Sequence, residues 1–225
     1  MCNVARTIMS IKIGICGLAG SGKDTAALIL RRVLYEQGKS FEIDRYAALL
    51  KKCAQLAFGD TFDDRDVKEE LVFVTPDLAD RMIDATDYCQ LELGLNPDEF
   101  EIWNDLCTKH LDSLTWVSPR LFQQLLGTEV GRTFNPSIWV DYLQNKDKDL
   151  IVPDVRFSNE NTDVTILITR HPVPRGVLHA SELYAAELQL IENPYDYVDY
   201  VIHNDGTVEE LETKLRFLAT TLKFK

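Results

Sequence analysis

Short apolar runs alternate along this chain with longer segments in which apolar residues recur at helical spacing. The spacing predicts helices over residues 22–37 and 46–58, which Gly38 and Gly59 would end. The short runs predict buried strands at residues 11–16, 41–44, 150–152, 164–169 and 200–203. Because the chain opens as strand, helix, strand, helix, we expect a parallel sheet with right-handed crossovers.

The middle of the chain has a helical pattern instead. Residues 60–70 are highly charged and are expected to form a loop or a solvated helix start. Two helices are predicted between residue 76 and about residue 114, separated at residues 94–97, and a third should begin at Ser118-Pro119. Residues 60–145 would then form a helical substrate-binding insertion above the sheet.

After the insertion, the strand at residues 150–152 is expected to stop at Pro153-Asp154. The spacing of Thr207 and Glu210 is typical of a capping box at the start of a C-terminal helix.

A glycine-rich stretch separates the first predicted strand from the first predicted helix. Residues 17–25 read Gly-Leu-Ala-Gly-Ser-Gly-Lys-Asp-Thr. Such glycines let backbone N–H groups turn toward a polyphosphate, and the following helix offers its positive N-terminus to the same anion. We therefore expect a P-loop whose lysine, Lys23, reaches the β- and γ-phosphates. A purely structural turn is the alternative.

Asp24 departs from the commonest form of this motif. It follows the lysine where Ser or Thr usually stands, and the hydroxyl comes one place later, at Thr25. This shift is more typical of small-molecule kinases than of GTPases or motor ATPases, which hold their metal with the hydroxyl next to the lysine.

The predicted elements and the motif together indicate an α/β chain with a three-layer fold of the P-loop NTPase type. About five parallel strands would be flanked by helices. The whole chain, residues 1–225, would form one kinase domain, with its core at residues 10–58 and 146–225 and a short lid at about residues 170–182.

The amino-acid composition argues against several classes of binding partner and against a zinc site. With 36 acidic and 24 basic residues the net charge is −12, which opposes binding to nucleic acid and to anionic membranes. The five cysteines form no C-x-x-C pair and are expected to be reduced, and the four histidines make no zinc pattern. Because no signal-peptide core and no membrane-spanning apolar stretch is present, we expect a cytoplasmic protein.

Phosphoryl transfer needs cations that neutralise the charge of the moving group, so a candidate site should show arginines at the carboxyl ends of parallel strands or on helices above them. Arg156 follows Asp154 at such a strand end, and Arg170 and Arg175 bracket His171-Pro-Val-Pro174. Asp154 could hold the waters of a Mg²⁺ ion, orient Arg156 or bind a sugar hydroxyl, and the sequence does not separate these roles. An arginine of the lid could reach the transferred phosphate, or it could simply end a strand.

Several motifs in order resemble the bacteriophage deoxynucleoside monophosphate (dNMP) kinases of the P-loop nucleotide kinase superfamily. Besides the glycine-rich stretch they lie at residues 45–51, 118–132, 135–140, 154–160, 179–182 and 204–207. The resemblance implies ATP-dependent phosphorylation of dNMPs for viral DNA synthesis in the host cytoplasm, with Mg²⁺ bound together with ATP.

The resemblance also implies residue roles. Thr25 would contact the magnesium, and Asp24 would act near the metal or the acceptor phosphate. ATP would be held by Gly17, Ala19, Gly20, Ser21, Gly22, Lys23, Asp24, Thr25, Asn204 and Gly206. The dNMP would be bound by Lys51, Arg120, Gln124, Thr128, Arg132, Trp139, Asp154, Arg156 and Glu160. The catalytic set would be Lys23, Asp24, Arg156 and Arg170.

Two alternatives remain open. One is another small-molecule kinase, similar to dephospho-coenzyme A kinase or phosphomevalonate kinase. The other is a nucleotide-sensing switch protein, although Asp24 and the Asp154-Val-Arg-Phe157 segment differ from the pattern of that class. The apolar face of Leu121, Leu125 and Leu126 is expected in the core, and a homodimer interface is the alternative.

Overall fold

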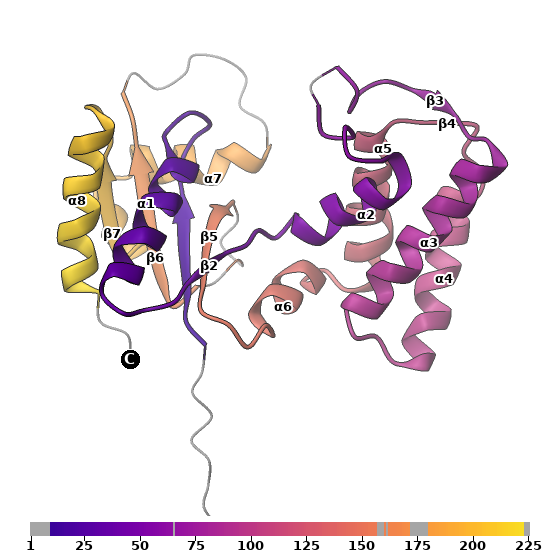
Figure 1. Cartoon of the computed structure of the whole chain (residues 1–225), viewed down its shortest axis with the longest axis horizontal. Coiled ribbons are helices and arrows are strands. Elements are labelled where there is room, and N and C mark those ends of the chain that lie inside the picture. Colours follow the sequence, from indigo (N-terminus) through magenta and orange to yellow (C-terminus); the bar gives the residue numbers. More distant parts are fainter. Residues whose placement is uncertain (1–9, 65, 157–159, 161, 172–179, 223–225) are drawn as a thin grey trace, which may run out of the picture. The chain divides into compact units, whose positions relative to one another are not determined.

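The computed structural model describes residues 10–64, 66–156, 160, 162–171 and 183–222, together with the backbone of 180–182 (Figure 1). The chain divides into two compact units. An α/β unit contains residues up to Arg45 and from Leu143 onward, and a helical unit contains Tyr46–Tyr142. The helix at residues 46–58, which the sequence pattern assigned to the core, therefore falls in the helical unit.

The α/β unit is built on a five-stranded sheet of order β2-β5-β1-β6-β7, in which every pairing is parallel. This confirms the α/β class and the parallel sheet. The strands are β1 (Lys12–Cys16), β2 (Glu42–Ile43), β5 (Leu150–Val155), β6 (Val164–Thr169) and β7 (Tyr200–His203). β1 is the central strand, so its carboxyl end lies between those of β5 and β6.

Strand β5 runs through Pro153 to Val155, so the predicted stop at Pro153-Asp154 is wrong. Gly14 of β1 pairs with Val152, but Cys16 pairs with Val155, so Pro153 and Asp154 together face Ile15. This is a β-bulge, a place where proline's missing N–H costs the ladder no hydrogen bond. β2 pairs with Leu150 and Ile151, and no strand among the described residues pairs with Pro153 on that edge.

Helices flank the sheet, an arrangement compatible with a three-layer fold. Side chains of α1 (Lys23–Glu36) and α8 (Val208–Thr221) share one buried core with Ile13 and Ile15 of β1. In Figure 1 these two helices lie in front of the strands and α7 (Ala180–Leu190) lies behind them. The predicted capping box of α8 is confirmed, since Thr207 and Glu210 hydrogen-bond each other's backbone N–H groups. A short 3₁₀-helix, η2 (Pro194–Asp196), precedes β7.

The helical unit has its own core around Trp103, Phe122 and Leu126, each fully buried. Its helices are α2 (Ala48–Phe58), α3 (Pro76–Glu92), α4 (Pro97–Leu111) and α5 (Pro119–Gln124), followed by the π-helix η1 (Leu125–Arg132) and by α6 (Ile138–Gln144), which runs across the unit boundary. Ser118 caps α5 as predicted, and the break between α3 and α4 is also confirmed.

The sequence pattern missed three features of this unit. A two-residue antiparallel ladder joins β3 (Val72–Phe73) to β4 (Trp116–Val117). The helix that starts at Pro119 continues as η1, and α6 was not predicted. The described part of the charged segment at residues 60–70 forms turns, in agreement with the loop prediction. None of the helices within the described residues combines the length and apolarity needed to span a bilayer.

Candidate functional site

The glycine-rich loop connects the carboxyl end of β1 to the first turn of α1. Gly17, Gly20 and Gly22 have φ angles of +151°, +75° and +96°, values that favour glycine. A Cβ on Gly17 would lie 2.3 Å from the carbonyl oxygen of Ile168 in β6. Glycine is therefore required at Gly17 both by the backbone angle and by the close neighbouring strand.

Lys23 folds back over this loop. Its Nζ atom donates hydrogen bonds to the carbonyl oxygens of Gly17, at 2.7 Å, and Leu18, at 2.8 Å. The backbone N–H of Ser21 also donates to Leu18, at 3.1 Å. The Oγ atom of Ser21 is buried and has no hydrogen-bond partner among the described residues. The ammonium group is thus hydrogen-bonded to carbonyl oxygens of the loop itself.

Asn204 supports the loop from the end of β7. Its side chain is buried, and Nδ2 donates a hydrogen bond of 2.8 Å to the carbonyl oxygen of Ser21. A Cβ on Gly22 would lie 2.4 Å from the same nitrogen. Gly206, two residues farther on, is exposed at the start of the turn that leads to α8. The Asn204 amide is therefore hydrogen-bonded to the glycine-rich loop itself.

Asp24 forms an ion pair with Arg45, the residue that follows the second predicted strand. Both side chains are exposed. Arg45 begins the predicted motif at residues 45–51 but is not among the site residues expected from the sequence. The sequence position of Arg45 could have identified it as a candidate site residue. Arg45 comes just after β2, in the same way that Arg156 comes just after β5.

The carboxyl ends of β5 and β6 bring further predicted residues to the edge of the sheet that carries the loop. Cys16 pairs with Val155 and with Leu167, which places Arg156 and Arg170 beyond neighbouring strand ends. Both arginines are exposed.

Two buried carboxylates lie near the end of β5, on Asp154 and Glu160. Glu160 Oε2 accepts a 2.6 Å hydrogen bond from the backbone N–H of Arg156. Arg175 and residues 172–179 of the predicted lid lie outside the described residues, as do the side chains of residues 180–182.

The remaining predicted residues lie in the helical unit. Lys51 pairs with Asp63 at 2.5 Å, and Arg120 pairs with Glu69 at 3.3 Å. The charged turn segment at residues 60–70 thus supplies counterions to two cations that were predicted to bind substrate. Gln124, Thr128 and Arg132 are exposed on α5 and η1, whereas Trp139 is buried.

The predicted site is therefore divided between the two units. The α/β unit carries the glycine-rich loop, Asp154, Arg156, Glu160, Arg170, Asn204 and Gly206. The helical unit carries Lys51, Arg120, Gln124, Thr128, Arg132 and Trp139. Within the described ranges, no group of three or more His, Cys, Asp or Glu side chains is arranged to hold a metal ion.

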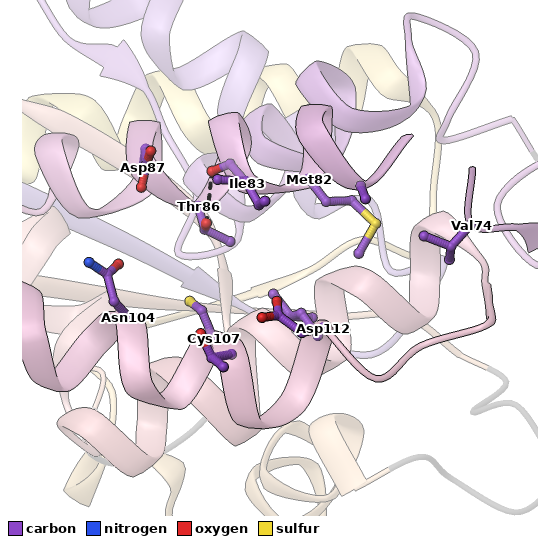
Figure 2. Close-up of a pocket in the computed structure, with 11 residues that line it drawn as sticks. Val74, Met82, Ile83, Thr86, Asp87, Asn104, Cys107 and Asp112 are labelled. Atoms are coloured by element: carbon purple, nitrogen blue, oxygen red, sulfur yellow. Dashed lines mark hydrogen bonds between the residues drawn. The ribbon is translucent and has the colours of Figure 1, made fainter. Parts of the chain in front are cut away.

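A cavity of about 280 Å³ lies between α3 and α4 in the helical unit (Figure 2). Its lining combines apolar side chains such as Met82 with polar ones such as Asp87 and Asp112. Cys107 also lines it, and burial raises the pKa of this thiol to about 12. None of the site residues predicted from the sequence lines this cavity.

Comparisons with known proteins identify no relative of the chain. No protein-family model, no curated protein and no solved structure matches it.

Proposed function

We propose that this protein transfers the γ-phosphate of ATP to deoxynucleoside monophosphates. The observation that carries the proposal is the loop of residues 17–22, closed by Lys23 at the carboxyl end of the central strand. Ligands of open parallel sheets bind beyond the carboxyl ends of the strands, where the strand order reverses. In this sheet the reversal falls at β1, because β5 pairs on one side of it and β6 on the other.

The charge at this edge supports a polyphosphate ligand. The chain as a whole carries a net charge of −12, yet Lys23, Arg45, Arg156 and Arg170 all lie at or just beyond the carboxyl ends of strands. The first turn of α1 adds backbone N–H groups and the positive end of the helix dipole. Such a local concentration of donors is what a triphosphate needs in an otherwise acidic protein.

The acceptor class rests on the resemblance to phage dNMP kinases and on side chains in the helical unit. Arg120, Gln124, Thr128 and Arg132 are all exposed and recur every four residues. Guanidinium groups bind phosphate through paired hydrogen bonds, while an amide and a hydroxyl can bind a base or sugar. Lys51 adds a further cation to this unit.

The proposed mechanism is direct transfer without a covalent enzyme intermediate. The loop amides and Lys23 hold the donor phosphates, and the arginines orient the acceptor oxygen and balance the charge of the moving group. Mg²⁺ bound with ATP would neutralise phosphate charge. It binds mostly through phosphates, waters and one or two protein oxygens, so the absence of a three-ligand cluster among the described residues is compatible with it. Thr25 and Asp154 are the protein oxygens proposed for this role.

A screen of phosphate acceptors tests the proposal. Purified protein is incubated with radiolabelled ATP, Mg²⁺ and each of the four dNMPs, the corresponding ribonucleotides and dephospho-coenzyme A or phosphomevalonate. We expect labelled deoxynucleoside diphosphates from the wild type and none from Lys23→Ala. Lys109→Ala, which removes an exposed lysine from α4, is the control and should retain activity.

Other results would identify the alternatives. Label that appears only on a coenzyme A precursor or on phosphomevalonate would replace the proposed acceptor. ATP hydrolysis that needs no acceptor and responds only to a partner protein would indicate a switch protein. Near-normal transfer by Lys23→Ala would contradict the assignment of the loop.

A further inference from the structure

The helix that carries the proposed acceptor residues changes type part-way along its length. It is an α-helix over Pro119–Gln124 and a π-helix over Leu125–Arg132. In an α-helix of 3.6 residues per turn, four residues overshoot a full turn by about 40°. In a π-helix, whose i→i+5 bonds give about 4.4 residues per turn, four residues fall short of a turn by about 33°.

These two deviations have opposite signs, so they offset each other over the exposed row Arg120, Gln124, Thr128 and Arg132. In a continuous α-helix, Arg132 would lie about 120° around the axis from Arg120. One four-residue step of α-helix followed by two of π-helix leaves the two arginines about 25° apart. Both guanidinium groups therefore leave the same face of the helix, with Gln124 and Thr128 between them.

Trp139 of α6 contacts the π-helix at two points. Its indole N–H donates a 2.9 Å hydrogen bond to the carbonyl oxygen of Gly127. The six-membered ring of the indole lies so close to Gly131 that a Cβ there would be 2.4 Å from Cζ2. Gly127 is similarly close to Leu50 of α2, whose Cδ1 would be 2.9 Å from an added Cβ. The two glycines thus let neighbouring side chains pack directly on the helix backbone.

Extended π-helices are rare because their hydrogen-bond geometry is less favourable than that of an α-helix. A run of eight residues therefore requires stabilisation from outside the helix. The Trp139 indole, which is 6% exposed, provides it by binding a backbone carbonyl and filling the space beside Gly131.

We propose that Trp139 is a positioning residue that holds residues 125–132 in the π register and thereby aligns Arg132 with Arg120. The alignment builds one extended face for an anionic ligand, and its use for a dNMP rests on the proposed function. Trp139 was predicted to bind substrate, but in this role it acts through the helix.

The π register can be tested without an activity assay, by introducing two histidines that can bind one metal ion only if the helix is a π-helix. Such a histidine pair is called a metal clip below. Histidines five residues apart lie about 140° apart in an α-helix but about 50° apart in a π-helix, so only a π-helix lets them share one ion. Gln124→His with Glu129→His, both at exposed positions, should bind Ni²⁺ and raise the melting temperature. Glu209→His with Lys214→His gives the same spacing on the α-helix α8 and should not.

Adding Trp139→Phe to the clip variant should weaken Ni²⁺ binding about tenfold, because the hydrogen bond to Gly127 is lost. Trp103→Phe is the matched control. Trp103 is buried in the same unit, but its indole nitrogen has no hydrogen-bond partner among the described residues. If Trp139→Phe does not fold, Gly131→Ala, which places a methyl group 2.4 Å from the present position of the indole Cζ2, should weaken the clip instead. Unchanged Ni²⁺ affinity in the folded variant would overturn the proposal.

Kinetics then test the consequence for substrate. Without the clip, Trp139→Phe should raise the KM for dNMP about tenfold and leave the KM for ATP unchanged, whereas Trp103→Phe should change neither. A weakened clip with an unchanged KM for dNMP would overturn the alignment role. If the wild type phosphorylates no dNMP, the proposed function fails, and the clip measurements still decide whether Trp139 sets the register.

Discussion

Asn204 and the carbonyl group of Ser21 are 183 positions apart in the sequence, and a 2.8 Å hydrogen bond joins them. The bond ties the end of the last strand to the loop that follows the first. Asn204 is 7% exposed, so its amide is largely shielded from competing water. The shape of the candidate phosphate loop therefore depends on a residue outside the glycine-rich motif.

Asn204→Ala should weaken both the fold and nucleotide binding. The buried Ser21 carbonyl would lose its donor, which should lower the free energy of unfolding by about 1–2 kcal/mol. The KM for ATP should rise, because the loop is less well held. Urea denaturation and ATP-dependence of the transfer rate measure the two effects. Asn193→Ala, at an exposed position, is the control, and equal KM values for the two variants would contradict the prediction.

Gly22→Ala and Gly20→Ala distinguish the cost of a strained backbone angle from the cost of a steric clash in the same loop. Both glycines have positive φ, so alanine at either position should cost about 1–2 kcal/mol of stability. Only at Gly22 would the added methyl group also meet a neighbour, Asn204 Nδ2 at 2.4 Å. Gly22→Ala should therefore be clearly the less stable variant in chemical denaturation. Equal midpoints would show that Asn204 moves aside without cost.

Asp24→Asn tests whether the residue after Lys23 takes part in the proposed phosphoryl transfer. Asp24 and Arg45 are exposed, so loss of their ion pair should change the free energy of unfolding by less than about 1 kcal/mol. We expect kcat to fall at least about tenfold, as when a preorganised charge is removed from an active site. A variant with unchanged kcat would show that the Asp24 carboxylate takes no part in transfer.

Arg216 should make the stability of the α/β unit depend on pH in acid. Its hydrogen bonds to Glu36 and Glu212 lower the pKa of both carboxyl groups from the ordinary value of 4.5. A lowered pKa in the folded state gives stabilisation that is present above pH 4.5 and lost as the pH falls through the lowered values. Wild type should thus exceed Arg216→Gln in stability at pH 7, and the gap should close toward pH 3. Urea titrations at both pH values measure it; a gap that persists in acid would contradict the linkage.

The cysteines Cys16 and Cys107 should resist alkylation in the folded protein. Burial raises the pKa of each thiol to about 12. At pH 8 such a group is thiolate in only about one molecule in ten thousand, and the thiolate is the reactive form. Mass spectrometry after iodoacetamide treatment should find both residues unmodified until denaturant is added. Rapid labelling of either cysteine in the native protein would show that its site opens.

The sequence predicted best where one local signal decides the structure. The apolar run before Gly17 and the glycines themselves predict a strand, a loop and a helix, and the structure contains all three. Pro97 and Ser118 likewise mark helix starts through the chemistry of their own first turns.

Features that depend on distant partners were not predictable in this way. Pro153 reads as a strand breaker, yet it is accommodated by a bulge against Ile15, about 140 residues earlier in the chain. The π-helix has an ordinary helical pattern, and the contacts of Trp139 and Leu50 that favour its register are tertiary. The two-residue ladder of β3 and β4 is too short to leave a periodic pattern.

The pairing of β1 with β5 and β6 has a consequence for the order of folding during synthesis. The strand that precedes the glycine-rich loop is made before its partners, which begin at Leu150 and Val164, and Asn204 comes later still. The helical unit, by contrast, is one continuous segment, Tyr46–Tyr142. On the ribosome, residues 46–142 are therefore complete before β1 can pair with β5 and β6, and the glycine-rich loop cannot be fully assembled until Asn204 has been translated.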